Sequence, residues 1–297
     1  MRPRSRSLPL LALLAGVVLL AACSRLDLAY RNLDWLLTWR IDSYLDLNAE
    51  QKAWLKPRLD RHLAWHCSTQ LPQLTSWLDQ DRADLARGEL DAARFQARFA
   101  DLRAALGEVS SEIGPTAAGL LQQLSPRQVE QLRQQMAKEN EKLRREFVEP
   151  PLDRQIAKRA ETTEERLKPW FGRLSAQQKA MVRRWAEQRG EQNRLWLDSR
   201  ERWQVALLAE LEGRRSADFP QRIERLLNDR QSYWSEAYRQ SFADGERSLA
   251  ELLGQLLASA DASQRQRLQD SLGSLRDDIA GLQCATPGEE AVASRSE

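Results

Sequence analysis

The sequence predicts an all-α protein that is built from long antiparallel helical hairpins. No alternating run rich in Val, Ile and Thr indicates a β-strand, and the 13 Gly and 11 Pro fall mostly at the ends of apolar-periodic stretches. A short pattern that begins a helix also recurs four times along the 297 residues. These observations together predict helices that are joined by short turns.

The recurring pattern is a capping box, in which Asn, Ser or Asp precedes a Gln by three positions. The cap side chain accepts from a backbone N–H of the first turn, and the Gln reaches back to the N–H of the cap residue. The four pairs are Asn48 with Gln51, Ser125 with Gln128, Ser175 with Gln178, and Asp261 with Gln264. The apolar residues that follow them are Leu55, Leu132, Val182 and Leu268. We therefore predict that a helix begins at each cap.

Residues 1–22 combine a basic start with a short apolar stretch. Three Arg precede residues 8–20, an apolar run of 13 residues that is too short for a membrane span of about 20. The run ends in Leu-Ala-Ala-Cys at residues 20–23, which resembles a bacterial lipobox. The resemblance implies a lipoprotein signal peptide, with Cys23 becoming the acylated N-terminus. An ordinary secretory signal with an incidental Cys is the alternative.

The expected location follows from that resemblance and from Ser24. Lipoproteins that stay at the inner membrane usually carry Asp at this position, so the resemblance implies a lipid anchor at the outer membrane, on its periplasmic face. Removing residues 1–22 takes three Arg from the 45 Lys and Arg, so 42 remain against 43 Asp and Glu. This balance excludes an electrostatic drive toward nucleic acid. We expect the membrane and proteins as partners, and no small-molecule ligand.

The chain divides at Pro150-Pro151 into two helical units. We predict a lipid-proximal helix over 23–46, unit 1 over 47–150, a linking helix over 151–173, unit 2 over 174–284 and a disordered polar tail over 285–297. Within the units, Gly114-Pro115 is expected to end a helix. One long helix is expected from the Ser175 box to Glu212, and an interruption near Gly245.

The two units repeat. Asn48 and Ser175 lie 127 residues apart, and Trp77 and Trp203 lie 126 apart. We interpret this spacing as an internal duplication, with two boxes in each unit. Chance similarity among helices rich in Leu, Gln and Arg is the alternative.

Two Cys remain after Cys23, and they suggest a disulfide. In an oxidising periplasm, Cys67 and Cys284 would pair and tie an early helix to the end of the last one. If the two sulfurs lie far apart in the fold, the bond is excluded.

The only two His are spaced to share one helix face. His62 and His66 stand at i and i+4, beside Cys67, and could chelate Zn²⁺ or Cu²⁺. The alternative is that they pack and hydrogen-bond at a helix junction, since no third ligand is evident. No phosphate loop, nucleophile elbow or Cys-x-x-Cys pair is present, so we predict no catalytic residue, no cofactor and no enzyme.

The ten Trp are predicted mostly as core residues, because Trp at helical spacing usually packs against another helix. A minority could line a concave apolar surface that takes unfolded clients. Trp35 and Trp39 follow Cys23 closely, and we expect them at the membrane interface.

The four boxes resemble the Leu-Thr-x-x-Gln motif of the Spy and CpxP family of small periplasmic proteins. That resemblance implies helical hairpins, a cradle-shaped pairing of two units, and chaperone or envelope-stress activity. This chain departs from the family in having Asn, Ser or Asp for Thr, and in its length. The whole chain more closely resembles proteobacterial lipoproteins that share a domain of unknown function, through the lipobox, Trp-Leu-Leu-Thr-Trp-Arg at 35–40, Tyr-Leu-Asp-Leu at 44–47 and Trp65-His66.

These features lead to three functional hypotheses. The first is a Spy-like holdase or envelope-stress interaction protein that works without ATP, with the two units as a covalent pseudo-dimer. The second is a structural or accessory lipoprotein that docks one envelope partner. The third is a periplasmic metal sensor.

Overall fold

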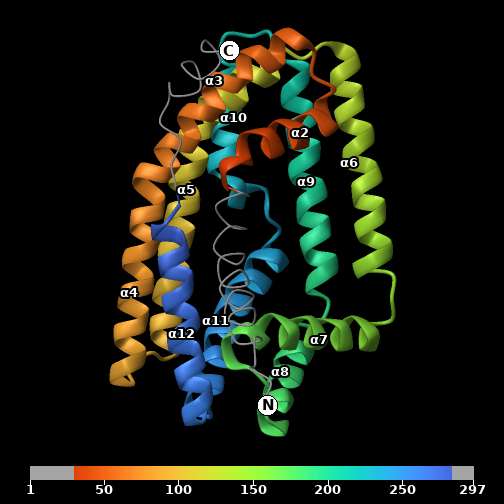
Figure 1. Ribbon diagram of the computed structural model, residues 1–297. Coiled ribbons are helices and arrows are strands. Elements are labelled where there is room, and N and C mark those ends of the chain that lie inside the picture. Colours follow the sequence, from red (N-terminus) through yellow and green to blue (C-terminus); the bar gives the residue numbers. More distant parts are fainter. Residues whose placement is uncertain (1–29, 283–297) are drawn as a thin grey trace, which may run out of the picture.

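A computed structural model describes residues 30–282, and this part of the chain is all-α, with no strand. The predicted all-α class is therefore confirmed. Figure 1 shows the helices α2 (Leu33–Leu45), α3 (Ala49–Trp65), α4 (Leu71–Arg87), α5 (Ala92–Gln122), α6 (Pro126–Phe147), α7 (Leu152–Phe171), α8 (Ala176–Gln188), α9 (Gln192–Glu212), α10 (Phe219–Asn228), α11 (Glu236–Ala258) and α12 (Ala262–Ala280).

The helices stand as two upright groups that are joined at both ends. Helices α4, α5 and α12 form one group, and α6 with α9 forms the other (Figure 1). Helix α2 crosses between them near one end and packs on α3 and α6, while α7 crosses near the other end and packs on α8 and α12.

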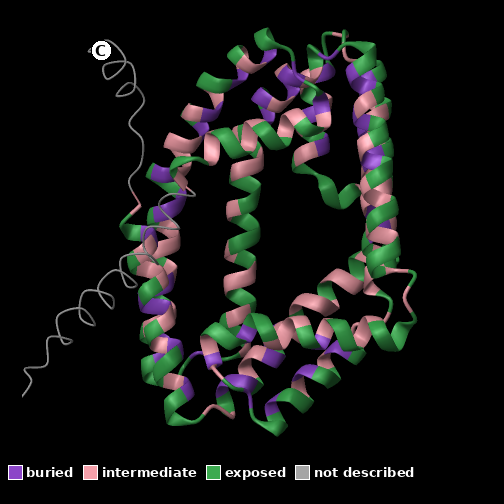
Figure 2. Ribbon diagram, turned by 45° about the vertical axis from the view of Figure 1, so that its right-hand side comes forward, coloured by how far each residue is buried: buried purple, intermediate pink, exposed green. Residues whose placement is uncertain are grey.

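Two separate apolar clusters form the core (Figure 2). The upper cluster is built by α2, α3, α5, α6, α9 and α10, and its fully buried members include Leu211, Phe219 and Ile223. The lower cluster is built by α4, α7, α8, α11 and α12, with Val182 and Leu256 fully buried. Each cluster therefore takes helices from both sides of Pro150-Pro151, because α9 and α10 pack with unit 1 and α4 packs with unit 2.

The expected helix end at Gly114-Pro115 is wrong, since α5 runs through both residues. An interior Pro costs a helix about 3 kcal/mol because it lacks the N–H and crowds the preceding turn. Tertiary packing outweighs that cost here. Gly114 lies against Glu224 of α10, and Ala118 is completely buried in the upper cluster.

The expected single helix from the Ser175 box to Glu212 is also wrong. It breaks into α8 and α9 at Gly190, whose φ of 43° lies in the left-handed region that Gly tolerates. Conversely, α11 continues through Gly245, where an interruption was expected. A Cβ at Gly245 would lie 2.6 Å from Nη2 of Arg189, so this Gly permits close approach of a side chain and does not end the helix.

Candidate functional site

The four capping boxes form at the starts of α3, α6, α8 and α12. In the third, Gln178 N–H donates to Ser175 Oγ over 3.2 Å, and Ser175 N–H donates to Gln178 Oε1 over 3.0 Å. The other three boxes make the same two bonds. The apolar residue seven positions after each cap is buried, at Leu55, Leu132, Val182 and Leu268. Each box therefore starts a helix and directs its first turns into the core.

The boxes also pair through their Gln side chains. Gln51 and Gln128 exchange two amide hydrogen bonds, with Nε2–Oε1 distances of 3.3 and 2.7 Å. Gln178 and Gln264 do the same over 2.9 and 3.0 Å. All four side chains are buried, and Gln178 is completely inaccessible. The pairs hold helix starts together within each predicted unit.

The remaining amide protons have partners too. Gln51 Nε2 donates to the carbonyl of Gln123, and Gln128 Nε2 donates to the carbonyl of Asp46. Both acceptors lie two residues before the cap of the opposite box. Neutral amides supply no nucleophile and no group that titrates near neutral pH. The Gln pairs therefore have a structural role, which is to hold helix starts together.

The two His have separate hydrogen-bond partners. His62 is buried, and its ring nitrogens lie 2.9 Å from Glu112 Oε1 and 2.7 Å from Thr116 Oγ1 on α5. His66 Nδ1 lies 3.2 Å from the Tyr30 hydroxyl. Within residues 30–282, no group of three or more His, Cys, Asp or Glu side chains is placed to hold a metal ion. The metal site stays a prediction, which titration with Zn²⁺ tests.

The Cys predictions fall partly outside the described residues. Cys67 is buried in the lower cluster at the π-helical turn between α3 and α4. Cys23 and Cys284 lie outside the described range, so lipidation and the disulfide stay predictions. Leu282 packs on the same cluster as Cys67.

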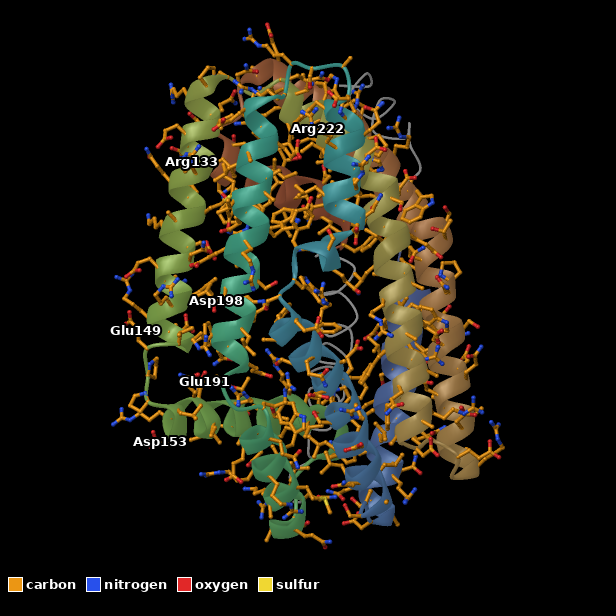
Figure 3. The ribbon with its side chains drawn as sticks, turned by 180° about the vertical axis from the view of Figure 1, so that it is seen from behind. Arg133, Glu149, Asp153, Glu191, Asp198 and Arg222 are labelled. Carbon is orange, nitrogen blue, oxygen red and sulfur yellow. The ribbon has the colours of Figure 1, made fainter. Side chains whose placement is uncertain are left out.

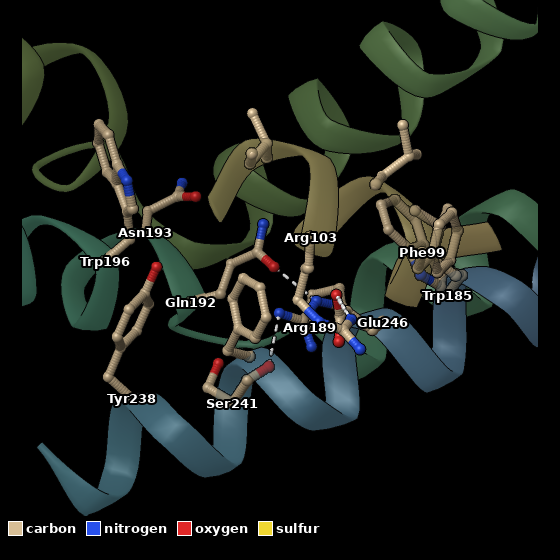
Figure 4. Close-up of a pocket in the computed structure, with 15 residues that line it drawn as sticks. Phe99, Arg103, Trp185, Arg189, Gln192, Asn193, Trp196, Tyr238, Ser241 and Glu246 are labelled. Atoms are coloured by element: carbon tan, nitrogen blue, oxygen red, sulfur yellow. Dashed lines mark hydrogen bonds and ion pairs between the residues drawn. The ribbon is translucent and has the colours of Figure 1, made fainter. Parts of the chain in front are cut away.

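A hollow of about 550 Å³ lies between α5, the α8–α9 break and α11 (Figure 4). Its walls are mostly apolar and aromatic. The lining side chains that carry this character are Phe99, Leu102, Leu106, Trp185, Trp196, Tyr238, Phe242 and Leu249. Leu106 is 68% exposed, Leu102 41% and Trp196 37%, so large apolar groups face solvent here. We call this site the apolar hollow.

A half-buried cation and an ion pair border the apolar hollow. Arg189 donates from Nε to Gln192 over 2.5 Å and from Nη2 to the Ser241 carbonyl over 3.0 Å (Figure 4). Burial lowers the pKa of its guanidinium below the ordinary value. Arg103 of α5 pairs with Glu246 of α11 across the rim. Within the described residues, the indole N–H of Trp185 is buried without a hydrogen-bond partner.

The sequence predicted in general terms that some Trp line a concave apolar surface, but it did not locate the apolar hollow, which Trp185 and Trp196 line. The signal was present as apolar residues at helical spacing, such as Leu102 with Leu106 and Tyr238 with Phe242. The same spacing describes a core helix. Which of these faces is covered depends on where α5 and α11 cross, and no local pattern encodes that crossing.

A second hollow, of about 450 Å³, lies between α2 and α6 and is lined mainly by polar and charged side chains.

Elsewhere on the described surface, the charged side chains are mixed in sign. Figure 3 shows acidic Glu149, Asp153 and Glu191 near the α6–α7 corner, and Arg133 further along α6. Within residues 30–282, none of the helices combines the length and the apolar composition that a membrane span requires.

The fold and these hollows define an all-helical protein with solvent-facing apolar and basic surfaces. The family described as "Family of unknown function (DUF6279)" matches residues 43–239, and the chain belongs to this family. The match runs from the end of α2 into α11 and so crosses Pro150-Pro151. The predicted membership of a family of unknown function is confirmed. No curated protein and no solved structure is significantly similar to the chain.

Proposed function

We propose that this protein binds exposed apolar segments of unfolded proteins in the periplasm and holds them without ATP. The observation that carries the proposal is the apolar hollow, in which Leu102, Leu106 and Trp196 face solvent. Contiguous exposed apolar surface with a polar rim is typical of protein-binding sites.

The geometry suits transient capture. The apolar walls gain free energy by covering a client's side chains, at about 25 cal/mol per Å² of apolar surface removed from water. The Arg103–Glu246 pair lies on the rim, and the indole N–H of Trp185 in the wall lacks a partner among the described residues. A surface with few directional contacts accepts many sequences, which is the behaviour of a holdase.

A variant pair tests the hollow directly. Leu102→Gln with Leu106→Gln removes apolar contact at residues that are 41% and 68% exposed, so folding should be little affected. Leu152→Gln with Val205→Gln is the matched control, because these residues are 42% and 67% exposed and do not line the hollow. Both variants should keep the helical circular dichroism of the wild type.

The measurement is suppression of aggregation of two unrelated clients, thermally unfolding citrate synthase and reduced α-lactalbumin. We expect suppression by the wild type at or below equimolar ratio, equal suppression by the control, and about tenfold weaker suppression by the Leu102/Leu106 variant, since each buried Leu contributes about 1.5–3 kcal/mol at full burial. If both variants suppress aggregation equally, the apolar hollow does not bind the clients. An inactive wild type that captures one envelope protein would favour the docking function.

The anchor is the second part of the proposal. The lipobox-like residues 20–23 support acylation of Cys23, and Ser24 supports sorting to the outer membrane. Radiolabelled palmitate should be incorporated into the wild-type chain and not into Cys23→Ser. Membrane fractionation of the same cells should place the wild type with outer-membrane proteins.

The internal duplication remains a proposal that the helix pairing supports. Helix α4 packs on α12, and at the corresponding place in the other unit α9 packs on α6. This reciprocal exchange is what two identical units would make as an intertwined dimer. Superposition of residues 48–149 on 175–283 tests it, and failure to align three consecutive helices would argue for chance similarity.

A further inference from the structure

The hollow between α2 and α6 is a basic groove, formed by different helices from the apolar hollow. Its walls are Trp39, Arg40, Ser43 and Tyr44 of α2 with Gln135, Lys138, Glu139, Lys142 and Arg145 of α6. The α6 residues recur at spacings of three and four, which places them along one side of that helix. The groove therefore carries four cations and one carboxylate.

The single carboxylate is already engaged. Glu139 accepts from the Tyr44 hydroxyl over 3.2 Å and lies 3.9 Å from Arg40. Lys138 and Lys142 are exposed and make no ion pair with any described residue. Arg145 lies 3.7 Å from Glu141, which is outside the groove, and both groups are exposed. Lys138 and Lys142 therefore leave the groove with an excess of positive charge.

The acids of α2 do not change this balance. Asp34 pairs with Lys56 over 3.5 Å, and Asp42 pairs with Lys52 over 2.9 Å, so both are turned toward α3. The side of α2 that meets α6 contributes Arg40 and no acid to the groove.

Exposed aromatic side chains adjoin the groove. Trp35 is 62% exposed, Trp39 57% and Leu36 38%, and their spacing along α2 puts the two Trp on one side of the helix. Trp has an apolar body with one polar N–H, and it is enriched where hydrocarbon meets water. Trp39 also lines the groove, so the aromatic and basic surfaces are continuous.

The position of the groove along the chain points to a membrane. Residues 1–29, with their apolar run and Cys23, lead directly into α2. Any anchor in that segment would bring α2 close to the bilayer surface. The cations alone would bind a soluble anion, whereas the two exposed Trp beside them are typical of a membrane interface.

We propose that the α2–α6 groove binds the headgroups of anionic phospholipids in the bilayer surface, with Lys138, Lys142 and Arg145 contacting phosphate and Trp35 and Trp39 lying in the interfacial layer. This binding orients the protein on the membrane. It does not depend on client binding or on acylation.

The test uses residues 24–297, which retain every described residue and carry no acyl group. Vesicles of phosphatidylcholine alone and with 30% phosphatidylglycerol are floated with the protein at 0.1 M salt. The groove variant is Lys138→Gln with Lys142→Gln and Arg145→Gln. The matched control is Lys158→Gln with Lys168→Gln and Arg183→Gln, which removes the same charge from exposed residues of α7 and α8.

We expect the wild type and the control to float with the anionic vesicles and not with phosphatidylcholine. Each cation near an anionic surface contributes about fivefold to binding, so the groove variant should bind at least tenfold more weakly. Trp35→Gln with Trp39→Gln, which leaves the cations in place, should also weaken binding. Equal losses in the groove and control variants would overturn the proposal, as would abolition of vesicle binding by millimolar inorganic phosphate, which would indicate a soluble-anion site.

Discussion

Gln51 and Gln128 hydrogen-bond to each other through both side-chain amides, although 77 residues separate them in the chain. Each Gln also closes its own capping box, so one side chain serves both a helix start and a tertiary contact. Gln178 and Gln264 repeat the arrangement at the other end of the molecule. Helix initiation and helix pairing are therefore coupled through the same four residues.

Replacing one member of a Gln pair should be costly. Gln178→Leu removes both amide hydrogen bonds to the buried Gln264 side chain, which keeps its bonds to Arg173 and Asp261, and it frees the N–H of Ser175. The free energy of unfolding should fall by about 2–3 kcal/mol. Adding Gln264→Leu should cost less than the sum of the single changes, because the pair acts as a unit. Urea unfolding followed by circular dichroism measures both. Gln134→Leu, at an exposed Gln of α6, is the control and should change stability by less than about 0.5 kcal/mol; additive losses would contradict the coupling.

Removing the Ser125 cap tests whether the boxes only start helices or also recognise clients. Ser125→Ala removes the acceptor for the Gln128 N–H and should cost about 0.5–2 kcal/mol, as cap removal does elsewhere. Thermal unfolding measures the loss. Aggregation suppression should be unchanged at a temperature where the variant is folded. Loss of client binding at full stability would instead show that the motif itself recognises clients.

His66 should make stability depend on pH. Burial lowers its pKa, so the folded state favours the neutral ring and the unfolded state binds more protons below the ordinary pKa of about 6.5. The contribution is fully present above that value and is lost as the pH falls through it toward the lowered pKa. The free energy of unfolding of the wild type should therefore fall between pH 7.5 and 5. The free energy of unfolding of His66→Phe should fall less over the same range. Parallel curves for the two proteins would assign the dependence to other groups.

The predicted disulfide joins Cys67 to Cys284. Leu282, two residues before Cys284, packs against the lower cluster, which also contains Cys67. We expect one disulfide-linked peptide pair in a non-reducing digest of periplasmic protein. Cys67→Ala with Cys284→Ala should lose about 5 kcal/mol of stability in the chain-entropy view, and reduction of the wild type should reproduce that loss. Two alkylated thiols in the untreated protein would exclude the bond.

The sequence predicted the elements whose signals are local. A capping box is satisfied by atoms three residues apart, and so Asn48, Ser125, Ser175 and Asp261 could be placed at helix starts without knowing what surrounds them. The all-α class followed from the same local patterns. The expected breaks at Gly114-Pro115 and Gly245 were wrong because tertiary packing can outweigh the preference of Gly and Pro for helix ends, even the cost of about 3 kcal/mol of an interior Pro.

Tertiary structure decided which helices meet, and with that the candidate sites. The pairing of Gln51 with Gln128, and of α4 with α12 across Pro150-Pro151, rests on free energy gained only when distant surfaces are buried together. The same crossings leave Leu106 facing solvent in the apolar hollow and place Trp39 and Lys142 in the walls of one basic groove. By itself the sequence determined where the four helices with capping boxes begin, because those hydrogen bonds are local. Only the fold decided which apolar and charged faces stay open, because exposure is a property of the whole packed chain.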